Sequence, residues 1–354
     1  MIDVAADQAL AFRVAGHHLD RRVGAEEAVA AFGLQEYPPE WGALAALRAR
    51  SLDDLPAATV TVNALRGSPY VVRRADARIF TAALVPEDEA GLRALIGPPA
   101  KEAAAAGYGV REALELVAAA ARDGLAAGPL DRDAFHQAMR ERLPDGLLPW
   151  CRGCQSHHVR PGFWRALGPF EVTEMPAKAT WGLADPPAMP IEDARAELVR
   201  RFLRVYGPAT HSQLASLAKT APNHAKRLFA AIADELEPAA VDGRKGFVLA
   251  EDAGRLESPP AAKGVRLLGG HDLYVAQPDR AALVPDARLR KRLFPSVGRP
   301  GAVLVDGVLT GLWRGHKQGE VLEVAVEWLG DAADVAEEAE AIARLRGCAA
   351  ARVV

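Results

Sequence analysis

Apolar residues recur at helical spacing from Ile191 to Tyr206. Leu198, Phe202 and Val205 fall on one face of this segment, and arginines lie between them. Gly207-Pro208 follows at once, and this pair is typical of a helix end. The pattern therefore predicts an amphipathic helix with an apolar face that packs against a core and a basic face turned outward.

Two more helices and a hairpin are predicted directly after this segment. Thr210 and Thr220 stand where helix N-caps belong, and Pro222 suits a first helical turn. The expected elements are helices over Leu214–Ala218 and from Thr220 to about Asp234, strands at Ala239–Val241 and Phe247–Ala250, and a turn over Asp242–Gly246. Three helices followed by a two-stranded wing predict a winged helix-turn-helix unit.

The first 85 residues repeat this order less clearly. The pattern predicts helices over Asp7–Arg22, Ala25–Phe32 and Pro39–Arg50, then strands over Ala58–Leu65 and Tyr70–Arg73. The segment Arg66–Pro69 between the two strands has the residues of a wing turn. We therefore expect a second winged-helix unit here.

The remaining segments change character along the chain. Helical patterns dominate from Asp88 to Leu143, and Pro176–Pro190, with four prolines, reads as a linker. Residues 263–330 are β-rich, with an Asp306-Gly307 hairpin signal, and a last helix is expected over Ala332–Arg346.

The predicted class is α+β, with tandem winged helix-turn-helix units and a β-rich C-terminal domain. The predicted domains are a winged-helix unit over 1–85, a mostly helical winged-helix-like unit over 86–175, a winged helix over 191–255, and a β-rich domain with a terminal helix over 263–354.

Charge sharpens this picture because the overall balance conceals local imbalance. The 354-residue chain carries a net charge of −3, with 43 Lys and Arg against 46 Asp and Glu. Between Arg195 and Ala230, however, seven basic residues face a single acid, Glu197. Basic stripes on a neutral body are typical of a phosphate-binding surface, although solvated helix faces give the same pattern.

Candidate DNA contacts follow from where basic and amide side chains fall on these elements. The start of the third helix can reach bases and phosphates from a groove, the first wing can reach phosphates, and a second basic run contains no acid. The candidates are Asn223, His224, Lys226 and Arg227 on the helix, Arg66 and Arg73 at the wing, and Arg288, Arg290, Lys291 and Arg292 in the basic run. Double-stranded DNA is the predicted partner, for a monomer with no membrane contact.

The cysteines offer one weak metal candidate. Cys151, Cys154 and His157 have the spacing of half a zinc site, but a closed site needs a fourth ligand. Buried thiols and imidazoles that satisfy backbone groups are the alternative, and we predict no cofactor. Three cysteines do not make a disulfide framework, so a reducing cytoplasm, with association to the nucleoid, is expected. His271-Asp272 could form an acid/base couple, although neighbours on a strand point to opposite faces.

Several motifs together resemble one family. They are Gly33-Leu34-Gln35, Leu65-Arg66-Gly67-Ser68, Tyr206-Gly207-Pro208-Ala209-Thr210, Val265-Arg266-Leu267-Leu268 with His271-Asp272-Leu273-Tyr274, Arg290-Lys291-Arg292 and Val305-Asp306-Gly307. In this order and spacing they resemble the tandem winged-helix family that includes the AlkZ and YcaQ DNA glycosylases. The resemblance implies three winged helices around a concave DNA channel and, in the glycosylases, excision of N-alkylated or crosslinked purines.

The resemblance also points to a catalytic segment. The glycosylases carry Gln-x-Gln or Gln-x-Asp where this chain has Gln35-Glu36-Tyr37. A glutamine amide can donate and accept hydrogen bonds at once, so a pair can hold the attacking water, and a carboxylate can accept its proton. Gln35 matches the first position, whereas Tyr37 is a poor base at neutral pH and Glu36 occupies the middle position.

Two functions therefore remain open. One is monofunctional hydrolysis of the N-glycosidic bond of a damaged purine, with Gln35, Glu36 and Tyr37 as the candidate catalytic residues. The other is a non-catalytic winged-helix DNA-binding or regulatory protein.

Overall fold

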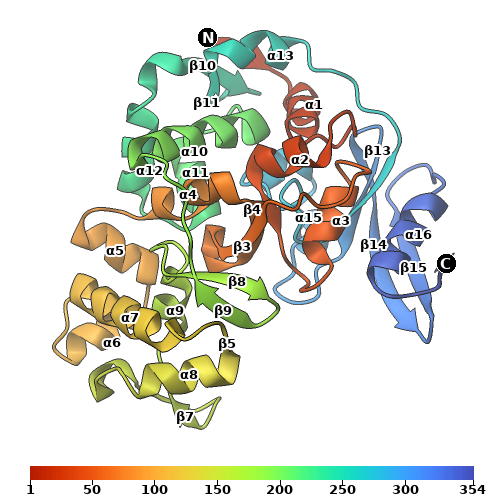
Figure 1. The fold of residues 1–354 in the computed structure, drawn as a ribbon. Coiled ribbons are helices and arrows are strands. Elements are labelled where there is room, and N and C mark those ends of the chain that lie inside the picture. Colours follow the sequence, from red (N-terminus) through yellow and green to blue (C-terminus); the bar gives the residue numbers. More distant parts are fainter. The chain divides into compact units, whose positions relative to one another are not determined.

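The computed structural model describes residues 1–354, and its contacts divide the chain into two compact units. Unit 1 contains Met1–Ala57, Arg200–Gln213 and Ala233–Val354, and unit 2 contains Ala58–Val199 and Leu214–Ile232. Both mix helices with antiparallel strands (Figure 1). The mixed α+β class is confirmed.

Helices dominate one half of unit 2. They are α5 (Glu89–Ile96), α6 (Pro99–Ala105), α7 (Val110–Leu125), α8 (Arg132–Arg140) and α9 (Pro161–Ala166). The carboxylates of Asp88 and Asp131 accept the backbone N–H groups of Gly91 and Ala134, so each caps the helix that it precedes. The helices bury alanine and leucine faces in one core, which also holds Phe135 and Trp181.

Short strands make up the rest of unit 2. Strands β3 (Thr59–Asn63) and β4 (Pro69–Arg73) form the hairpin predicted for the first wing, around the 3-10 turn Leu65–Gly67. The other elements are β5 (Leu130–Asp131), β6 (Trp150–Cys151), β7 (Ser156–His157), β8 (Thr173–Ala177), β9 (Thr180–Leu183), α4 (Ala77–Phe80) and α12 (Pro222–Ala230). Two helices, α10 (Ile191–Tyr206) and α11 (His211–Ala218), contribute residues to both units.

Two sheets define unit 1. Strands β10 (Leu236–Val241) and β11 (Arg244–Leu249) form the predicted hairpin, and β1 (Ile2–Val4) adds to it in parallel. The second sheet has the order β12 (Val265–Leu268), β13 (Gly301–Val305), β14 (Val308–Gln318), β15 (Val321–Trp328) and β16 (Ala350–Val353).

The predicted Asp306-Gly307 turn is confirmed, whereas the turn expected over Asp242–Gly246 contains only Asp242 and Gly243, because β11 already begins at Arg244. Asp242 and Gly243 have φ values of 48° and 74°, and Asp306 and Gly307 have φ values of 49° and 82°. Positive φ at both central residues is the type I′ geometry that Asp-Gly favours.

The helices of unit 1 cover these sheets. They are α1 (Ala6–Gly16), α2 (Ala25–Phe32), α3 (Gly42–Arg48), α13 (Ala253–Glu257), α14 (Arg280–Leu283), α15 (Ala287–Leu293) and α16 (Ala336–Leu345), and β2 (Leu34–Gln35) follows α2. Ala45 of α3 and Ile342 of α16 are buried in one cluster with Val303 and Leu322 of the five-stranded sheet. Gly16 of α1 packs directly against the backbone of Arg204. A Cβ at position 16 would lie 2.1 Å from the carbonyl oxygen of Arg204, so this close approach requires glycine.

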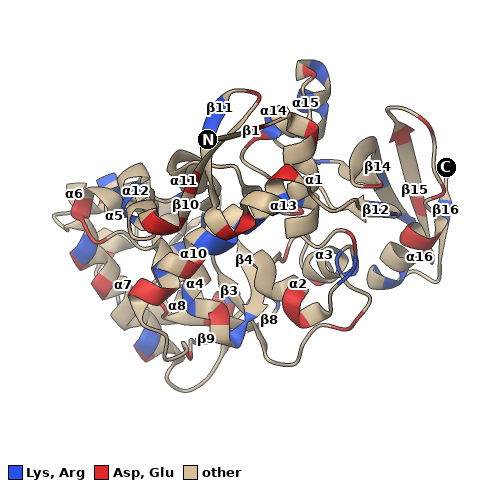
Figure 2. Cartoon of the chain, turned by 90° about the horizontal axis from the view of Figure 1, so that it is seen from above, with Lys and Arg blue, Asp and Glu red and all other residues tan.

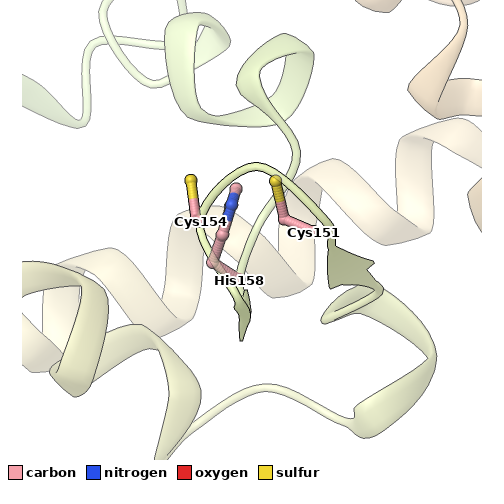
Figure 3. Close-up of side chains that lie close together, drawn as sticks. All are labelled: Cys151, Cys154 and His158. Atoms are coloured by element: carbon pink, nitrogen blue, oxygen red, sulfur yellow. The ribbon is translucent and has the colours of Figure 1, made fainter.

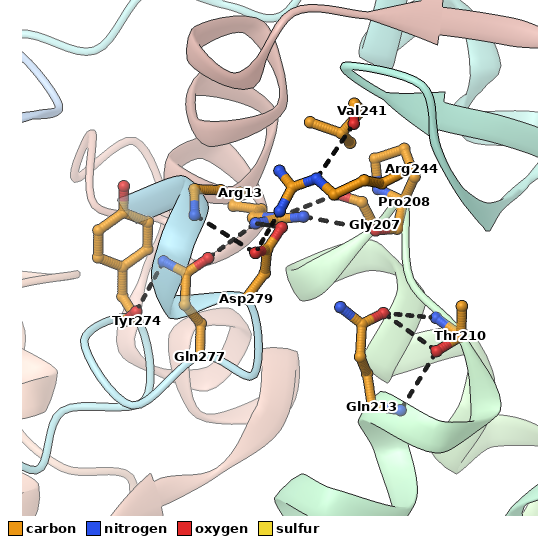
Figure 4. A network of polar contacts seen from close by, with 11 residues as sticks. Arg13, Gly207, Pro208, Thr210, Gln213, Val241, Arg244, Tyr274, Gln277 and Asp279 are labelled. Carbon is orange, nitrogen blue, oxygen red and sulfur yellow. Dashed lines mark hydrogen bonds and ion pairs between the residues drawn. The ribbon is translucent and has the colours of Figure 1, made fainter. Parts of the chain in front are cut away.

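A buried arginine ties three segments of unit 1 together (Figure 4). Arg13 of α1 donates to the carbonyl oxygens of Gly207 (3.2 Å) and Pro208 (3.4 Å) and to Oε1 of Gln277 (2.8 Å). Desolvation lowers its pKa, although the nearby Asp279 acts in the opposite direction. The guanidinium thereby fixes α1 against the turn that ends α10.

The structure corrects several predicted boundaries. Residues expected in the Pro176–Pro190 linker form part of the β8–β9 hairpin, whose two strands pair between Thr173 and Leu183. The first helix ends at Gly16 rather than Arg22, the third helix of the winged unit ends at Ala230, and the last helix begins at Ala336. Strands β1 and β16 were not predicted.

Candidate functional site

The segment Gln35–Tyr37 lies in unit 1, directly after α2. Gly33 ends that helix with φ of 67°, and β2 follows. The side chain of Gln35 is buried, at 8% exposure, whereas Tyr37 is 51% exposed. β2 ends at Gln35, so Tyr37 lies beyond the strand, in a loop that leaves its ring half exposed.

Glu36 has a structural contact of its own. Its Oε2 atom accepts the backbone N–H of Ala43 at 2.8 Å, at the start of α3. The loop that makes this contact is tight. A Cβ on Gly42 would lie 2.4 Å from the backbone nitrogen of Tyr37, so the loop can close only around a glycine. The carboxylate therefore stabilises the loop, and its predicted catalytic role stays a prediction.

Tyr37 contacts a residue more than two hundred positions away. Its ring centroid lies 4.3 Å from that of His271, and the rings meet at 62° in an edge-to-face arrangement. His271 follows β12 through Gly269-Gly270, and the latter glycine packs against the carbonyl of Pro300. Gln35, Tyr37 and His271 thus belong to one region of unit 1, which sequence spacing alone did not bring together.

Asp272 is not free to act with His271. Arg50 binds it through both terminal guanidinium nitrogens, at 2.7 and 2.8 Å, and both side chains are almost fully buried. Asp272 also accepts the backbone N–H of Tyr274 at 2.9 Å. The acid/base couple considered for His271-Asp272 is therefore wrong: the carboxylate anchors the loop that carries His271.

The predicted contacts on α12 fall into three kinds. Asn223 and Lys226 are exposed, and Arg227 pairs with Asp88 at 2.7 Å. His224 is only 2% exposed, and its Nε2 lies 2.9 Å from the carbonyl oxygen of Ala83. Burial therefore removes His224 from the candidate interface, because its ring packs inward on the apolar face of the helix.

The arginines of α10 that drew attention to this region are largely neutralised within their own units. Arg195 pairs with Glu87 at 2.6 Å, and Arg200 pairs with Glu235 at 2.6 Å. Hydrogen bonding to these arginines lowers the pKa of both glutamates. Figure 2 shows basic and acidic residues close together along this helix. Acids from elsewhere in the chain thus balance part of the local excess of positive charge.

Unit 2 contains a cavity with basic side chains in its lining. It has a volume of about 410 Å³, and its lining includes Arg66, Arg165 and Lys219 but no acid. Arg66 has φ of 61° and donates its Nε–H to the carbonyl oxygen of Leu217 at 3.0 Å. Arg73, the other candidate at this wing, pairs with Asp76 at 2.5 Å.

The basic run on α15 likewise contains both residues with partners in the protein and exposed residues. Arg290 donates to the carbonyl oxygens of Val284 and Pro285, and Arg292 pairs with Glu327. Arg288 and Lys291 are exposed and remain the better candidates for a phosphate contact.

The candidate metal site contains a different histidine from the one predicted. Cys151, Cys154 and His158 place one ligand atom each within 4.8 Å of one another (Figure 3). His157 is turned away, with its Nδ1 atom 2.7 Å from the carbonyl oxygen of Leu148. The strand register explains this difference, since His157 pairs with Trp150 in the β6–β7 ladder and His158 lies beyond it.

Comparison with known proteins identifies the family of the chain. The family model for DNA glycosylase AlkZ-like proteins matches residues 41–345. The chain belongs to the AlkZ-like DNA glycosylase family.

The chain is also similar to one curated protein and to one solved structure. An interstrand DNA cross-link repair glycosylase from Streptomyces sahachiroi is 31% identical over 193 residues, which cover 50% of this chain and 48% of that protein. The chain is therefore matched to about half the length of this curated relative. The structure of the Streptomyces sahachiroi DNA glycosylase AlkZ matches with a TM-score of 0.74 and 22% identity over the whole of both chains, which shows a shared fold.

The AlkZ-like match has a boundary that matters for the site. It begins at residue 41, so the segment Gln35–Tyr37 precedes it, whereas Arg50 and His271 lie within it. The catalytic and DNA-contacting residues accordingly stay predictions.

None of the helices combines the length and apolar character that crossing a bilayer requires.

Proposed function

We propose that this protein is a DNA glycosylase that removes an N-alkylated or crosslinked purine from double-stranded DNA by hydrolysing its N-glycosidic bond. Its membership of the AlkZ-like family carries this proposal. The name of the Streptomyces relative, a repair glycosylase for interstrand cross-links, supports the same substrate class.

Gln35 is the residue to which we assign the attacking water. The amide oxygen of Gln35 can accept a hydrogen bond from the water, and the amide N–H can donate one to the water oxygen. These two hydrogen bonds orient the nucleophile without introducing a charge. Burial of this side chain favours a fixed orientation, because few rotamers fit at 8% exposure. A fixed donor and acceptor cost little reorganisation when positive charge develops on the sugar.

Tyr37 and His271 are assigned two functions that an amide does not supply: a surface for base stacking and a proton acceptor. The half-exposed phenol offers an aromatic face on which an extruded base can stack. The imidazole of His271 contacts this phenol, and a neutral imidazole has a ring nitrogen that can accept a proton, a role that a phenol cannot fill. We propose that His271 replaces the second polar residue of the family motif.

DNA binding is proposed to use tandem winged helices. The chain order of α10, α11, α12 and the β10–β11 hairpin is that of a winged helix, and α1, α2, α3 and the β3–β4 hairpin repeat it. Within unit 2, Lys219, Arg66 and Arg165 line a cavity free of acids, which suits a phosphate group. We propose that the protein acts as a monomer.

The alternative, a non-catalytic DNA-binding protein, is favoured by one observation. The carboxylate of Glu36, the only acid of the motif, is engaged by Ala43, so the segment offers no free carboxylate to a water.

A base-release assay separates the two functions. Duplexes carrying 7-methylguanine, 3-methyladenine or an interstrand crosslink are incubated with excess protein, and released base is quantified by chromatography. We expect release by the native protein, a loss of 100-fold or more in Gln35→Ala, and a loss of about 10-fold or more in His271→Ala. The matched control Gln137→Ala, an exposed glutamine on α8, retains full activity.

Each outcome decides between the proposals. Duplex binding without release from any substrate supports the non-catalytic protein. Release that persists in a folded Gln35→Ala variant moves the site away from this segment, and release unchanged in His271→Ala removes only the role given to that imidazole.

A further inference from the structure

The hairpin formed by β6 and β7 brings three metal-binding side chains together. Its ladder has only two residue pairs, Trp150 with His157 and Cys151 with Ser156. Cys151 ends the first strand, Cys154 lies in the exposed turn, and His158 follows the second strand. A two-stranded ribbon this short is not stable by itself, so something else must hold the turn.

The spacing of the three side chains suits one small ion. The two sulfur atoms and a ring nitrogen all lie within 4.8 Å of one another. A tetrahedral zinc ion, with bonds of about 2.3 Å to sulfur and about 2.1 Å to nitrogen, holds such atoms roughly 3.5 to 3.8 Å apart. Small side-chain rotations, above all of the exposed Cys154, close this difference.

The orientation of His158 is the second, independent observation. Its Nδ1 lies 2.8 Å from the carbonyl oxygen of Val159, so Nδ1 carries the proton and Nε2 has a free lone pair. Nε2 is buried and has no hydrogen-bond partner. A buried acceptor without a partner is costly, and a backbone contact that fixes the opposite nitrogen is the arrangement of metal-binding histidines.

We propose that Cys151, Cys154 and His158 bind one zinc ion, with water in the fourth position. Two thiolates and an imidazole select zinc over magnesium or calcium, which prefer oxygen ligands. The ion would close the turn of the β6–β7 hairpin. Both cysteines are free thiols, and a disulfide between them would leave Nε2 of His158 without a partner, so the metal accounts for more of the structure.

Zinc content of the purified protein tests the proposal. The full chain is prepared under reducing conditions with a cleavable tag that does not bind metal, incubated with equimolar zinc, desalted and measured by plasma mass spectrometry. We expect about one zinc per chain in the native protein and less than a tenth of that in Cys154→Ser and His158→Ala. His157→Ala and Cys348→Ser are matched controls that keep the metal, since neither residue belongs to the group.

Cobalt provides a second readout that does not depend on the folding of a variant. Cobalt bound to the native protein should show the thiolate-to-metal charge-transfer bands and intense visible bands of a tetrahedral site, and equimolar zinc should abolish them. Absence of stoichiometric zinc, zinc retained by a folded His158→Ala variant, or a cobalt spectrum without thiolate bands each overturns the proposal.

Discussion

The two units bury different kinds of side chain. Unit 1 buries charged groups: Arg13, Arg50 and Asp272 are 1%, 3% and 5% exposed. The main core of unit 2 consists of apolar side chains, many of them alanine and leucine on neighbouring helices. Unit 1 is assembled from three separate stretches of chain, whereas most of unit 2 is one continuous stretch.

The difference suggests how each unit selects one arrangement of its segments over the alternatives. Local helices joined by short turns find their partners through apolar packing alone, because few alternative arrangements compete. Distant segments have more alternatives, and a buried polar contact penalises every arrangement that leaves it unmade. In unit 1 such contacts place the loop of His271 and the turn at Gly207.

Breaking the buried ion pair should have the largest effect. Asp272→Asn leaves Arg50 buried without a charge partner, and we expect a loss of about 3–5 kcal/mol in the free energy of unfolding. Urea unfolding measures it. The double variant Arg50→Met/Asp272→Leu should recover much of the loss, because it removes both charges. A loss below about 1 kcal/mol in Asp272→Asn would show that the pair does not organise unit 1.

A smaller effect is expected from the buried His17 of unit 1. Desolvation, and then Arg50, His18 and Arg13, lower its pKa well below the usual value of 6.5. The folded protein therefore keeps this ring neutral where the unfolded chain binds a proton, so stability falls as the pH drops below 6.5. Between pH 7.5 and 5.5 the contribution is about 1.4 kcal/mol.

Urea unfolding at these two pH values checks this expectation. His17→Leu should reduce the pH dependence by that amount, while His316→Leu, an exposed histidine, should leave it unchanged. An equal pH dependence in native protein and His17→Leu contradicts the assignment.

The smallest effect concerns the basic cavity of unit 2. Lys219→Ala should change stability by less than about 0.5 kcal/mol, because the side chain is exposed. It should weaken binding to duplex DNA and reduce the slope of log affinity against log salt by about one unit. Fluorescence anisotropy at several salt concentrations measures this slope. Lys101→Ala, an exposed lysine of the same unit, is the control, and equal slopes in both variants would exclude the cavity from the interface.

Sequence reasoning succeeded where structure is local. The apolar face of α10 follows from a spacing that helices impose, and Leu198 and Phe202 are indeed fully buried. The Asp306-Gly307 turn follows from the backbone preference of this residue pair, whereas the turn expected over Asp242–Gly246 was predicted three residues too long. Strands β1 and β16 were missed because each has only a few residues and pairs with a distant segment.

The site was harder to predict for the same reason. The carboxylate of Glu36 and the ring of His271 acquire their partners only through folding, and no periodicity announces either contact. Counting charges misled in a further way: the arginines of α10 suggested a phosphate-binding stripe because their acidic partners, Glu87 and Glu235, lie far away in the sequence. His224 sat among polar neighbours yet faces inward, since a helix turns by 100° at each residue.

The discontinuity of unit 1 has a consequence for synthesis. Its first 57 residues leave the ribosome long before residues 233–354 exist to cover them. At about 5–20 residues per second, this interval lasts roughly 10–40 s. During that time, while unit 2 is being translated, the nascent segment exposes the apolar faces of its helices to solvent, where a chaperone can hold them.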